Sequence, residues 1–550
     1  MTTTTPSAST ATKVVVATAI AVPFAGFVAG MQGASANISS TALVSASRHL
    51  HMSGSTQALA ASVQTLAIAA TVISTGLIAD RIGRRTMLMI ALALTCVGQL
   101  VVAVSPATAI YMLGMAITGI GMGATYGAAF GYLVSIVPKA KFASAMGIFT
   151  AFSMLSGLVF TFVGGILCGI DWRLAFLLLP VVTVIALIVT PFVLPKIAPV
   201  TGGAFDLIGQ ILLAVGVIGF LYACSQFAES LTSFKTLGPL ALGVVMLVAF
   251  FVRESKARDH FFPISLFRSP IFLAAICAGF IYNFGTAVTF LQVTNLWQYV
   301  TGLKAAQVSV WQLPLLLSGI VAGLVTGRLI GKQISDRVAI LGGGVMLLVG
   351  TVFLAMANGS HTLVPFLPGL IVAGAGAVVA AVPFGSLILR ESTPEYVGPV
   401  TGSRTTIGQI FYTLGFSLSM VAVDRFTDIG VISHLKADGA PPSSLSTGLD
   451  ALTVYTSTGQ KPTSTVGTEA LQAASSSYGH AFSITLIGAG TIAVLVGLLA
   501  FFLLGGGRDK HDSSAPDDTT APDDSADTPD ATDTTPDTTS GPAPLAASAS

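Results

Sequence analysis

Charged side chains are rare in this sequence, and one compact charged cluster lies between Gly76 and Arg85. Asp80 supplies its single carboxylate, which can accept hydrogen bonds from a helix N-terminus or pair with an arginine. Gly83 permits a tight turn, because glycine adopts backbone conformations that other residues avoid. The other charges are positive: Arg81, Arg84 and Arg85. Such a cluster predicts a charge-based lock between helix ends.

A second group of candidate residues is polar but uncharged and interrupts otherwise apolar runs. These side chains can offer hydrogen bonds to a ligand, or can bond one helix to another, which is worth about 0.6 kcal/mol on average in membranes. Both interpretations remain open, and the segment 270–298 is the richest. The candidates are Tyr282, Asn283, Gln292, Asn295 and Gln298, together with Gln32 and Gln64.

Carboxylates and imidazoles lie at the ends of the apolar runs, and none is expected near the middle of one. Asp424 and Arg425, at the outer end of such a run, are candidates for ion coupling, and so is Arg404. Arg404 could meet an anionic head group or anchor its helix at the membrane interface, and we favour the anchor. The four cysteines show no metal-ligand spacing. We expect no metal, no cofactor and no enzymatic activity, because no nucleophile–base arrangement stands out.

The composition indicates a membrane protein. Of 550 residues, 53% are hydrophobic and 9% are charged, whereas soluble domains carry roughly 25% charged residues. Apolar runs long enough to cross a hydrocarbon core of about 30 Å predict fourteen helices, grouped six, two and six. The formal net charge of +1 gives no indication of a nucleic-acid partner.

Loop charges predict the orientation. With the N-terminus in the cytoplasm, 18 of the 25 lysines and arginines fall in inside segments and 7 in outside segments, and positive charge favours the cytoplasmic side. We therefore expect a multi-pass protein of the cell (inner or plasma) membrane with both termini cytoplasmic.

This organisation divides the chain into five parts. They are a cytoplasmic N-terminal tail (1–12), an N-terminal six-helix bundle (13–195), two linker helices (200–253), a C-terminal six-helix bundle (262–505) and an acidic tail (506–550). A long extracytoplasmic loop at 424–480 is rich in serine, threonine and glycine, and we expect it to be flexible or loosely folded. The acidic tail repeats aspartate, threonine and proline, which predicts disorder.

Small residues recur every fourth position in two corresponding helices, and this spacing forms a groove where another backbone can approach. The fourth predicted helix has Gly119, Gly123, Gly127 and Gly131, and the fourth of the second six has Gly369, Ala373, Ala377, Ala381 and Gly385. The same pattern at the same ordinal position indicates a duplicated six-helix unit.

The stretch Gly76–Arg85 resembles the cytoplasmic signature of the major facilitator superfamily, Gly-x-x-x-Asp-Arg-x-Gly-Arg-Arg, at every defining position. The six-two-six pattern resembles the fourteen-helix drug/proton antiporter branch of that superfamily. Fragments such as Trp172–Phe176 and Phe205–Gly209 are similar to it, and the resemblance covers about residues 13–505. It implies an all-α polytopic membrane protein with the major facilitator fold, in which two bundles rock about a central cavity.

The resemblance implies a secondary active transporter that exports lipophilic small molecules, in the manner of a multidrug transporter, with protons as the candidate coupling ion. Asp80 and its arginines, with Gly76 and Gly83, would form a conformational latch between the bundles. Met115 stands where the family usually carries an arginine, and we place it with the polar candidates in the substrate cavity. A transporter of lipids or other amphiphiles without proton coupling is the alternative, because it would explain the missing acids.

Overall fold

The computed structural model describes the chain in ten ranges. They are residues 8–52, 54–138, 141–197, 206–227, 232–256, 262–303, 305–330, 332–390, 397–437 and 463–505. Nearly all of this is helical, because a helix satisfies its own backbone donors and acceptors where lipid offers none. The predicted tail 506–550 lies outside the described residues, as does most of the predicted tail 1–12.

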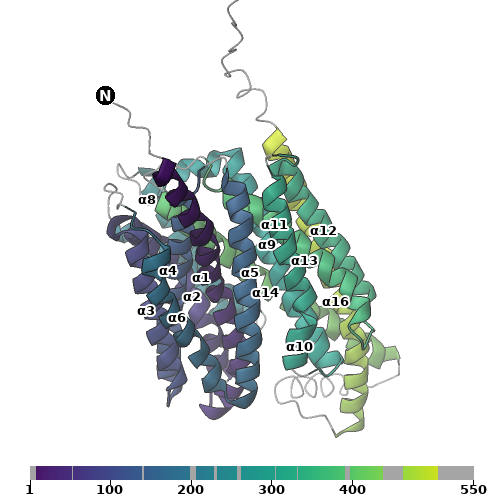
Figure 1. Cartoon of the computed structure of the whole chain (residues 1–550). Coiled ribbons are helices and arrows are strands. Elements are labelled where there is room, and N and C mark those ends of the chain that lie inside the picture. The colour runs from purple at the N-terminus through teal and green to yellow at the C-terminus, as the bar shows by residue number, and fades with distance from the viewer. Residues whose placement is uncertain are drawn as a thin grey trace, which may run out of the picture. The chain divides into compact units, whose positions relative to one another are not determined.

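The first half of the protein consists of six long helices, followed by two linker helices (Figure 1). The six are α1 (Ala8–His49), α2 (Gly54–Ile82), α3 (Arg84–Ala103), α4 (Thr108–Ile136), α5 (Phe142–Ile170) and α6 (Trp172–Val193). The linker helices α7 (Leu207–Gln226) and α8 (Phe234–Lys256) pack against each other, and α7 also contacts α2 and α14.

The second half repeats the pattern with six further long helices and short connecting turns. The long helices are α9 (Pro270–Asn295), α11 (Leu313–Leu329), α12 (Asp336–Met356), α13 (Leu367–Leu387), α14 (Val397–Ala437) and α16 (Thr465–Gly505). The short elements are η2 (Ile264–Arg268), η3 (Leu296–Val300), α10 (Ala305–Trp311) and η4 (Val364–Phe366). The start of α1 and the end of α16 lie at the same end of the bundle in Figure 1.

The two glycine-rich helices occupy equivalent positions in the two halves. Helix α4 packs against α2 and α3, and α13 packs against α11 and α12. A Cβ added to Gly119 would lie 2.5 Å from the carbonyl oxygen of Gln64 in α2, and one added to Gly369 of α13 would lie 2.9 Å from that of Gly350 in α12. The small side chains thus allow close backbone approach, as the four-residue spacing predicts.

Helix α2 is bent, and it ends in the turn that the charged cluster predicts. Its segments Ser62–Val72 and Ser74–Ile82 meet at 48°. Thr71 and Thr75 bond back to carbonyl oxygens of their own helix at 2.6 and 2.9 Å, a type of contact that often accompanies bending. Gly83 then adopts a φ of 92°, which favours glycine, and α3 begins at the next residue.

The number of membrane crossings is not confirmed as fourteen. In the described part of the chain, eleven helices are long and apolar enough to cross a membrane, and the bent α2 would be a twelfth. The apolar segment Ile208–Cys224 of α7 is shorter than the length required. The all-helical class agrees with the prediction, while the count of fourteen crossings stays a prediction.

The predicted loop at 424–480 is wrong in its boundaries. Helix α14 continues to Ala437 and α16 begins at Thr465, so helix occupies both ends of that segment, and 438–462 lies outside the described residues. Small residues explain the difference: a Cβ added to Gly430 of α14 would lie 2.5 Å from the hydroxyl of Ser477 in α16. The two helical extensions therefore pack closely and stabilise each other. The polar composition of residues 424–480 did not predict this helical structure.

The two halves meet through small residues of α5 and α11. A Cβ added to Gly147 would lie 2.9 Å from the Cα of Gly327, and Gly323 is also in contact with Gly147. In a second contact between the halves, the hydroxyl of Thr406 in α14 donates a 3.3 Å hydrogen bond to the carbonyl oxygen of Ala69 in α2. These contacts lie toward the end of the bundle that the loop charges assign to the cytoplasm.

Candidate functional site

A cavity of about 260 Å³ lies between the two halves. Its walls come from α1, α2, α4 and α5 of the first half and from α9, α11, α13 and α14 of the second. Small-molecule sites typically measure roughly 300–1,000 Å³, and the volume of this cavity lies just below that range. Spaces between the helices of a bundle are among the places where small molecules bind in proteins.

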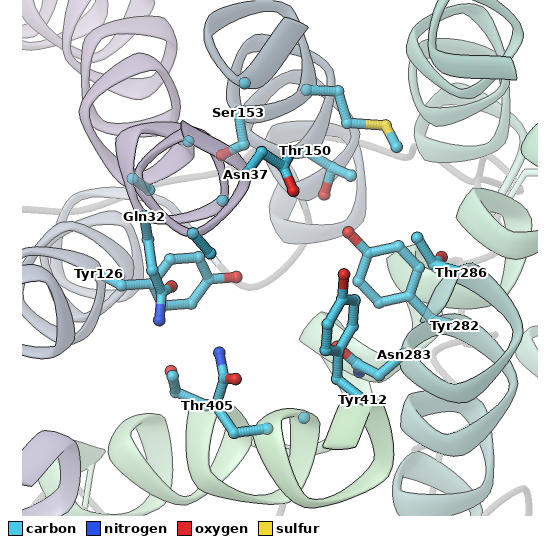
Figure 2. A pocket seen from close by; sticks show the side chains of 18 of the residues that line it. Gln32, Asn37, Tyr126, Thr150, Ser153, Tyr282, Asn283, Thr286, Thr405 and Tyr412 are labelled. Carbon is cyan, nitrogen blue, oxygen red and sulfur yellow. The ribbon is translucent and has the colours of Figure 1, made fainter. Parts of the chain in front are cut away.

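Most polar groups of the cavity are hydroxyls and amides. Figure 2 shows Tyr126, Tyr282 and Tyr412 directing their hydroxyl ends into it from three different helices. Apolar side chains such as Phe149 and Leu316 complete the walls. Among the residues that line this cavity, none is acidic, none is histidine or lysine, and Arg404 carries the one charge.

Arg404 is buried between the halves, with 4% of its surface exposed. Its Nη1 donates a hydrogen bond to the hydroxyl of Tyr126. Its guanidinium carbon lies 4.7 Å from the ring centre of Phe130 and 4.9 Å from that of Phe384, within cation–π range. The favoured interpretation of Arg404 as an interface anchor is therefore wrong, because the side chain points inward and not toward head groups.

Three of the eight residues predicted for the cavity line it: Gln32, Tyr282 and Asn283. Gln32 is buried and its Nε2 has no hydrogen-bond partner among the described residues. The Nδ2 of Asn283 donates to the carbonyl oxygen of Gly279 at 2.8 Å. Both amides lie at the cavity wall, where a ligand could use their remaining hydrogen-bonding capacity.

Gln64 and Met115 do not line the cavity, and their placement there is corrected. Gln64 donates from Nε2 to the hydroxyl of Ser35 at 2.6 Å and accepts from that of Ser39 at 2.9 Å. The Ser39 hydroxyl also contacts the sulfur of Met115 at 3.8 Å. This buried network joins α1, α2 and α4, so these polar groups bond helix to helix.

Gln292, Asn295 and Gln298 also lie outside the cavity wall. The Nε2 of Gln292 donates to Ser419 in α14 at 3.0 Å, Asn295 contacts the sulfur of Met420 at 3.8 Å, and Gln298 is exposed in η3. Helical geometry explains the division, because residues three to four apart share a face. The cavity face of α9 carries Asn283, Thr286 and Phe290.

The charged cluster forms a clamp inside the first half. Asp80 pairs with Arg84 through Oδ1 and Nη2 at 2.8 Å, and both side chains are 8% exposed. Nη1 of Arg84 also donates to the hydroxyl of Ser135 at 2.7 Å and to the carbonyl oxygen of Gly131. These contacts join the ends of α2 and α3 to α4. The latch between the halves stays a prediction.

The remaining members of the cluster differ in exposure: Gly76 and Gly83 are buried, Arg85 is partly buried and Arg81 is exposed. Of the three candidates for coupling, Arg404 lines the cavity, whereas Asp424 and Arg425 are exposed in the distal part of α14 and do not line it. A coupling role for them remains untested.

Sequence reasoning missed several cavity residues, notably Tyr126, Tyr412 and Gln409. Helix α14 presents Arg404, Thr405, Gly408, Gln409 and Tyr412 to the cavity. Their spacing follows one face of a helix, which the sequence could have indicated. Tyr126, in contrast, lies in an apolar, glycine-rich helix whose pattern gives no signal.

Comparison with known proteins identifies relatives that match most of the helical region. The family model described as "Major Facilitator Superfamily" matches residues 24–416. An uncharacterized MFS-type transporter of Mycobacterium tuberculosis is 26% identical over 380 residues, which is 67% of this chain and 54% of that relative. This chain therefore matches about half the length of that relative.

Two further relatives are similar at comparable identity. The multidrug resistance protein Stp of Mycobacterium tuberculosis is 26% identical over 361 residues, covering 64% of this chain and 66% of Stp. The multidrug transporter protein MdtP of Bacillus subtilis is 27% identical over 354 residues, covering 62% and 64%.

Solved structures share the fold at low sequence identity. The human organic anion transporter MFSD10 has a TM-score of 0.55 and 13% identity, with 89% of this chain and 98% of that chain covered. The proton:xylose symporter XylE has a TM-score of 0.56 and 12% identity, with 90% and 96% covered. With the family model matching most of its length, this chain belongs to the Major Facilitator Superfamily.

Proposed function

We propose that this protein is a secondary active transporter that exports lipophilic small molecules by alternating access. The observation that carries the proposal is the cavity, whose walls come from both repeated halves. The names of the relatives Stp and MdtP, a multidrug resistance protein and a multidrug transporter, support export of drug-like compounds. The proposal assigns transport, not catalysis, and places the protein in the cell membrane with both termini cytoplasmic.

Alternating access requires the contacts between the halves to separate and re-form. At one end these are the approach of Gly147 to Gly327 and the hydrogen bond from Thr406 to Ala69. Small residues suit this role, because two backbones can meet without interlocked side chains. Opening this end would expose the cavity to the side that the loop charges assign to the cytoplasm.

The lining disfavours cationic substrates. A cation at bilayer depth is costly without a counter-charge, by about 3 kcal/mol on insertion scales, and no lining residue is acidic. Neutral, zwitterionic or weakly anionic lipophiles fit the amides and hydroxyls better. Proton coupling would then use groups outside the cavity, with Asp424 and Asp80 as the candidates.

A second candidate function is transport of lipids or other amphiphiles without proton coupling. It is favoured by the same lining, in which one cationic side chain stands among aromatic and apolar walls. A lipid with a small head group would present its polar end to these side chains and its acyl chain to the apolar walls.

Reconstituted proteoliposomes would test these functions. Transport of a neutral lipophilic dye, a quaternary ammonium dye and a fluorescent phospholipid would be compared with and without a pH gradient. We expect the neutral dye to be transported in preference to the cation. Strong gradient-driven preference for the cation would contradict the proposed selectivity, and preference for the phospholipid would favour the second candidate.

A pair of amide variants provides the matched control. Asn283→Leu removes an amide that lines the cavity, whereas Gln298→Leu removes an exposed amide outside it. We expect the first to reduce transport of the neutral dye and the second to transport like the parent. Equal behaviour of the two variants would argue against this cavity as the substrate site.

A further inference from the structure

Two arginines are buried in the described part of the chain, and they differ in their counter-charges. Arg84 is 7% exposed and pairs with the carboxylate of Asp80 at 2.8 Å. Arg404 is 4% exposed and takes part in none of the three ion pairs of the described residues. A buried charge normally has an ionic partner, so the missing partner of Arg404 needs an explanation.

Neutral groups hold Arg404 in place without cancelling its charge. The Tyr126 hydroxyl accepts from Nη1, and the Phe130 and Phe384 rings lie within 5 Å of the guanidinium carbon. Aromatic faces stabilise a guanidinium yet leave its edge free to bind a further group. Its Nε is buried and has no hydrogen-bond partner among the described residues. The site is therefore positively charged and incompletely hydrogen-bonded.

The surrounding cavity adds further donors and an apolar wall. Gln32 holds an Nε2 without a partner, and the Tyr282 and Tyr412 hydroxyls point into the cavity (Figure 2). Phe149 and Leu316 provide apolar surface. An arginine edge with neutral donors and no carboxylate nearby matches the oxygens of a carboxylate, phosphate or sulfonate.

We infer that Arg404 is the receptor for the anionic group of the substrate, so that the transported compounds are lipophilic organic anions. This inference rests on the proposed transport function and specifies its substrate class. The anion supplies the counter-charge that the protein lacks, while the hydrophobic body of the substrate lies against the apolar walls. The same chemistry would also suit the head group of an anionic lipid, so the test separates the two sources.

Equilibrium dialysis with the purified full-length protein in a non-ionic detergent would test the inference. The probes are radiolabelled 2-naphthoate and its uncharged methyl ester, which share one hydrophobic body. At about pH 7.5, where arginine is charged and the acid is ionised, we expect the anion to bind about tenfold more tightly than the ester. Equal binding of both probes, or tighter binding of the ester, would overturn the inference even if Arg404 variants do not fold.

Charge variants would assign the preference to Arg404. Arg404→Gln should abolish the roughly tenfold preference for the anion over the ester, while Arg404→Lys should retain part of that preference. Arg337→Gln is the matched control, because it also removes a positive charge beside an aromatic ring, Phe501 at 5.2 Å, but lies outside the cavity lining. An anion preference that survives in Arg404→Gln, or is lost equally in Arg337→Gln, would contradict the role of Arg404.

Transport measurements separate this inference from the proposed function. Proteoliposomes of neutral lipid that transport the ester but show no preference for naphthoate would refute the anion receptor and leave transport intact. Transport of neither probe, in protein shown to be folded, would refute both. Adding phosphatidylglycerol to the vesicles identifies the source of the anion. If this anionic lipid abolishes the naphthoate transport that requires Arg404, the natural ligand is a lipid head group. If naphthoate transport is unchanged, the natural ligand is a soluble anion.

Discussion

Arg404 and Tyr126 join the two halves of the protein, since Nη1 of Arg404 in α14 donates a hydrogen bond to the Tyr126 hydroxyl in α4. Both residues also line the cavity. The same side chains therefore form part of the contact between the halves and part of the candidate substrate site. Binding at the site and movement of the halves are expected to influence each other through this bond.

Tyr126→Phe should shift the protein toward the state in which the cavity is open at the end predicted to be cytoplasmic. The change removes the acceptor but keeps the ring, and a hydrogen bond from a charged donor contributes about 1.5 kcal/mol, or roughly a tenfold change in the ratio of states. Labelling of Thr286→Cys in the cavity by an impermeant maleimide from the cytoplasmic side should increase. Tyr132→Phe is the control, because that hydroxyl bonds to Pro195 within the first half. Equal labelling in both variants would contradict the prediction.

Asp80→Asn should destabilise the protein. If the predicted latch between the halves exists, the variant should also open the cavity at the end predicted to be cytoplasmic. Removing one partner of a buried ion pair costs about 3 kcal/mol, and Arg84 would keep its bonds to Gly131 and Ser135. The midpoint of thermal unfolding in detergent should fall clearly. Asp336→Asn is the control and should change it little, because its 3.9 Å partner Arg390 is 61% exposed. Unchanged maleimide labelling of the cavity would contradict a latch between the halves. It would not contradict the clamp that Asp80 and Arg84 form inside the first half.

Gly147→Ala should impede closure between the halves. The added methyl would lie 2.9 Å from the Cα of Gly327, and overpacking of this kind costs about 1–3 kcal/mol in the closed state. Transport should slow and labelling of the cavity from the cytoplasmic side should rise. Gly342→Ala serves as the control, because nothing lies within 4 Å of its added methyl. A similar loss of transport in both variants would indicate a general effect of alanine.

Asp206 should contribute stability that depends on pH. It precedes α7, and hydrogen bonds from Arg253 at 2.8 and 3.1 Å lower its pKa below the ordinary value of 3.8. The contribution is present above about pH 3.8 and is lost as the pH falls through the lowered pKa. Asp206→Asn should therefore unfold at a lower temperature than the parent near neutral pH, and the difference should vanish in strong acid.

The effect should be small, because the Arg253 side chain is 40% exposed and solvent screens the pair. Arg253→Gln should reproduce the Asp206→Asn result, whereas Lys256→Gln, a neighbouring exposed charge, should not. A difference between parent and Asp206→Asn that persists unchanged in strong acid would show that the ion pair is not its cause.

A reporter fused after residue 550 should be accessible from the cytoplasm alone. The positive loop charges predict that both chain ends lie on that side, and the start of α1 and the end of α16 lie at one end of the bundle (Figure 1). Protease protection in sealed vesicles of known orientation would measure it. The variant Ser446→Cys, in the sequence between α14 and α16, should instead be labelled from outside. The reverse pattern would refute the orientation.

The helices and the family signature could be predicted from the sequence because they depend on local properties. A long apolar run must be helical in lipid, since a helix bonds its own backbone. Gly83 at the end of α2 predicted the turn through its own backbone freedom, and its φ of 92° agrees. The four-residue glycine spacing likewise predicted where α4 would pack closely, because spacing on a helix fixes which residues share a face.

The tertiary structure alone decided which polar residues face the cavity. Gln64 and Gln292 have the same chemistry as Gln32, yet packing gives the first two partners on neighbouring helices and leaves Gln32 at the cavity wall. Arg404 near the start of α14 suggested an interface anchor, but the position of α4 and α13 surrounds it with aromatic rings. The physical reason is that hydropathy identifies a span, whereas the rotation of each helix depends on contacts with residues far away in the chain.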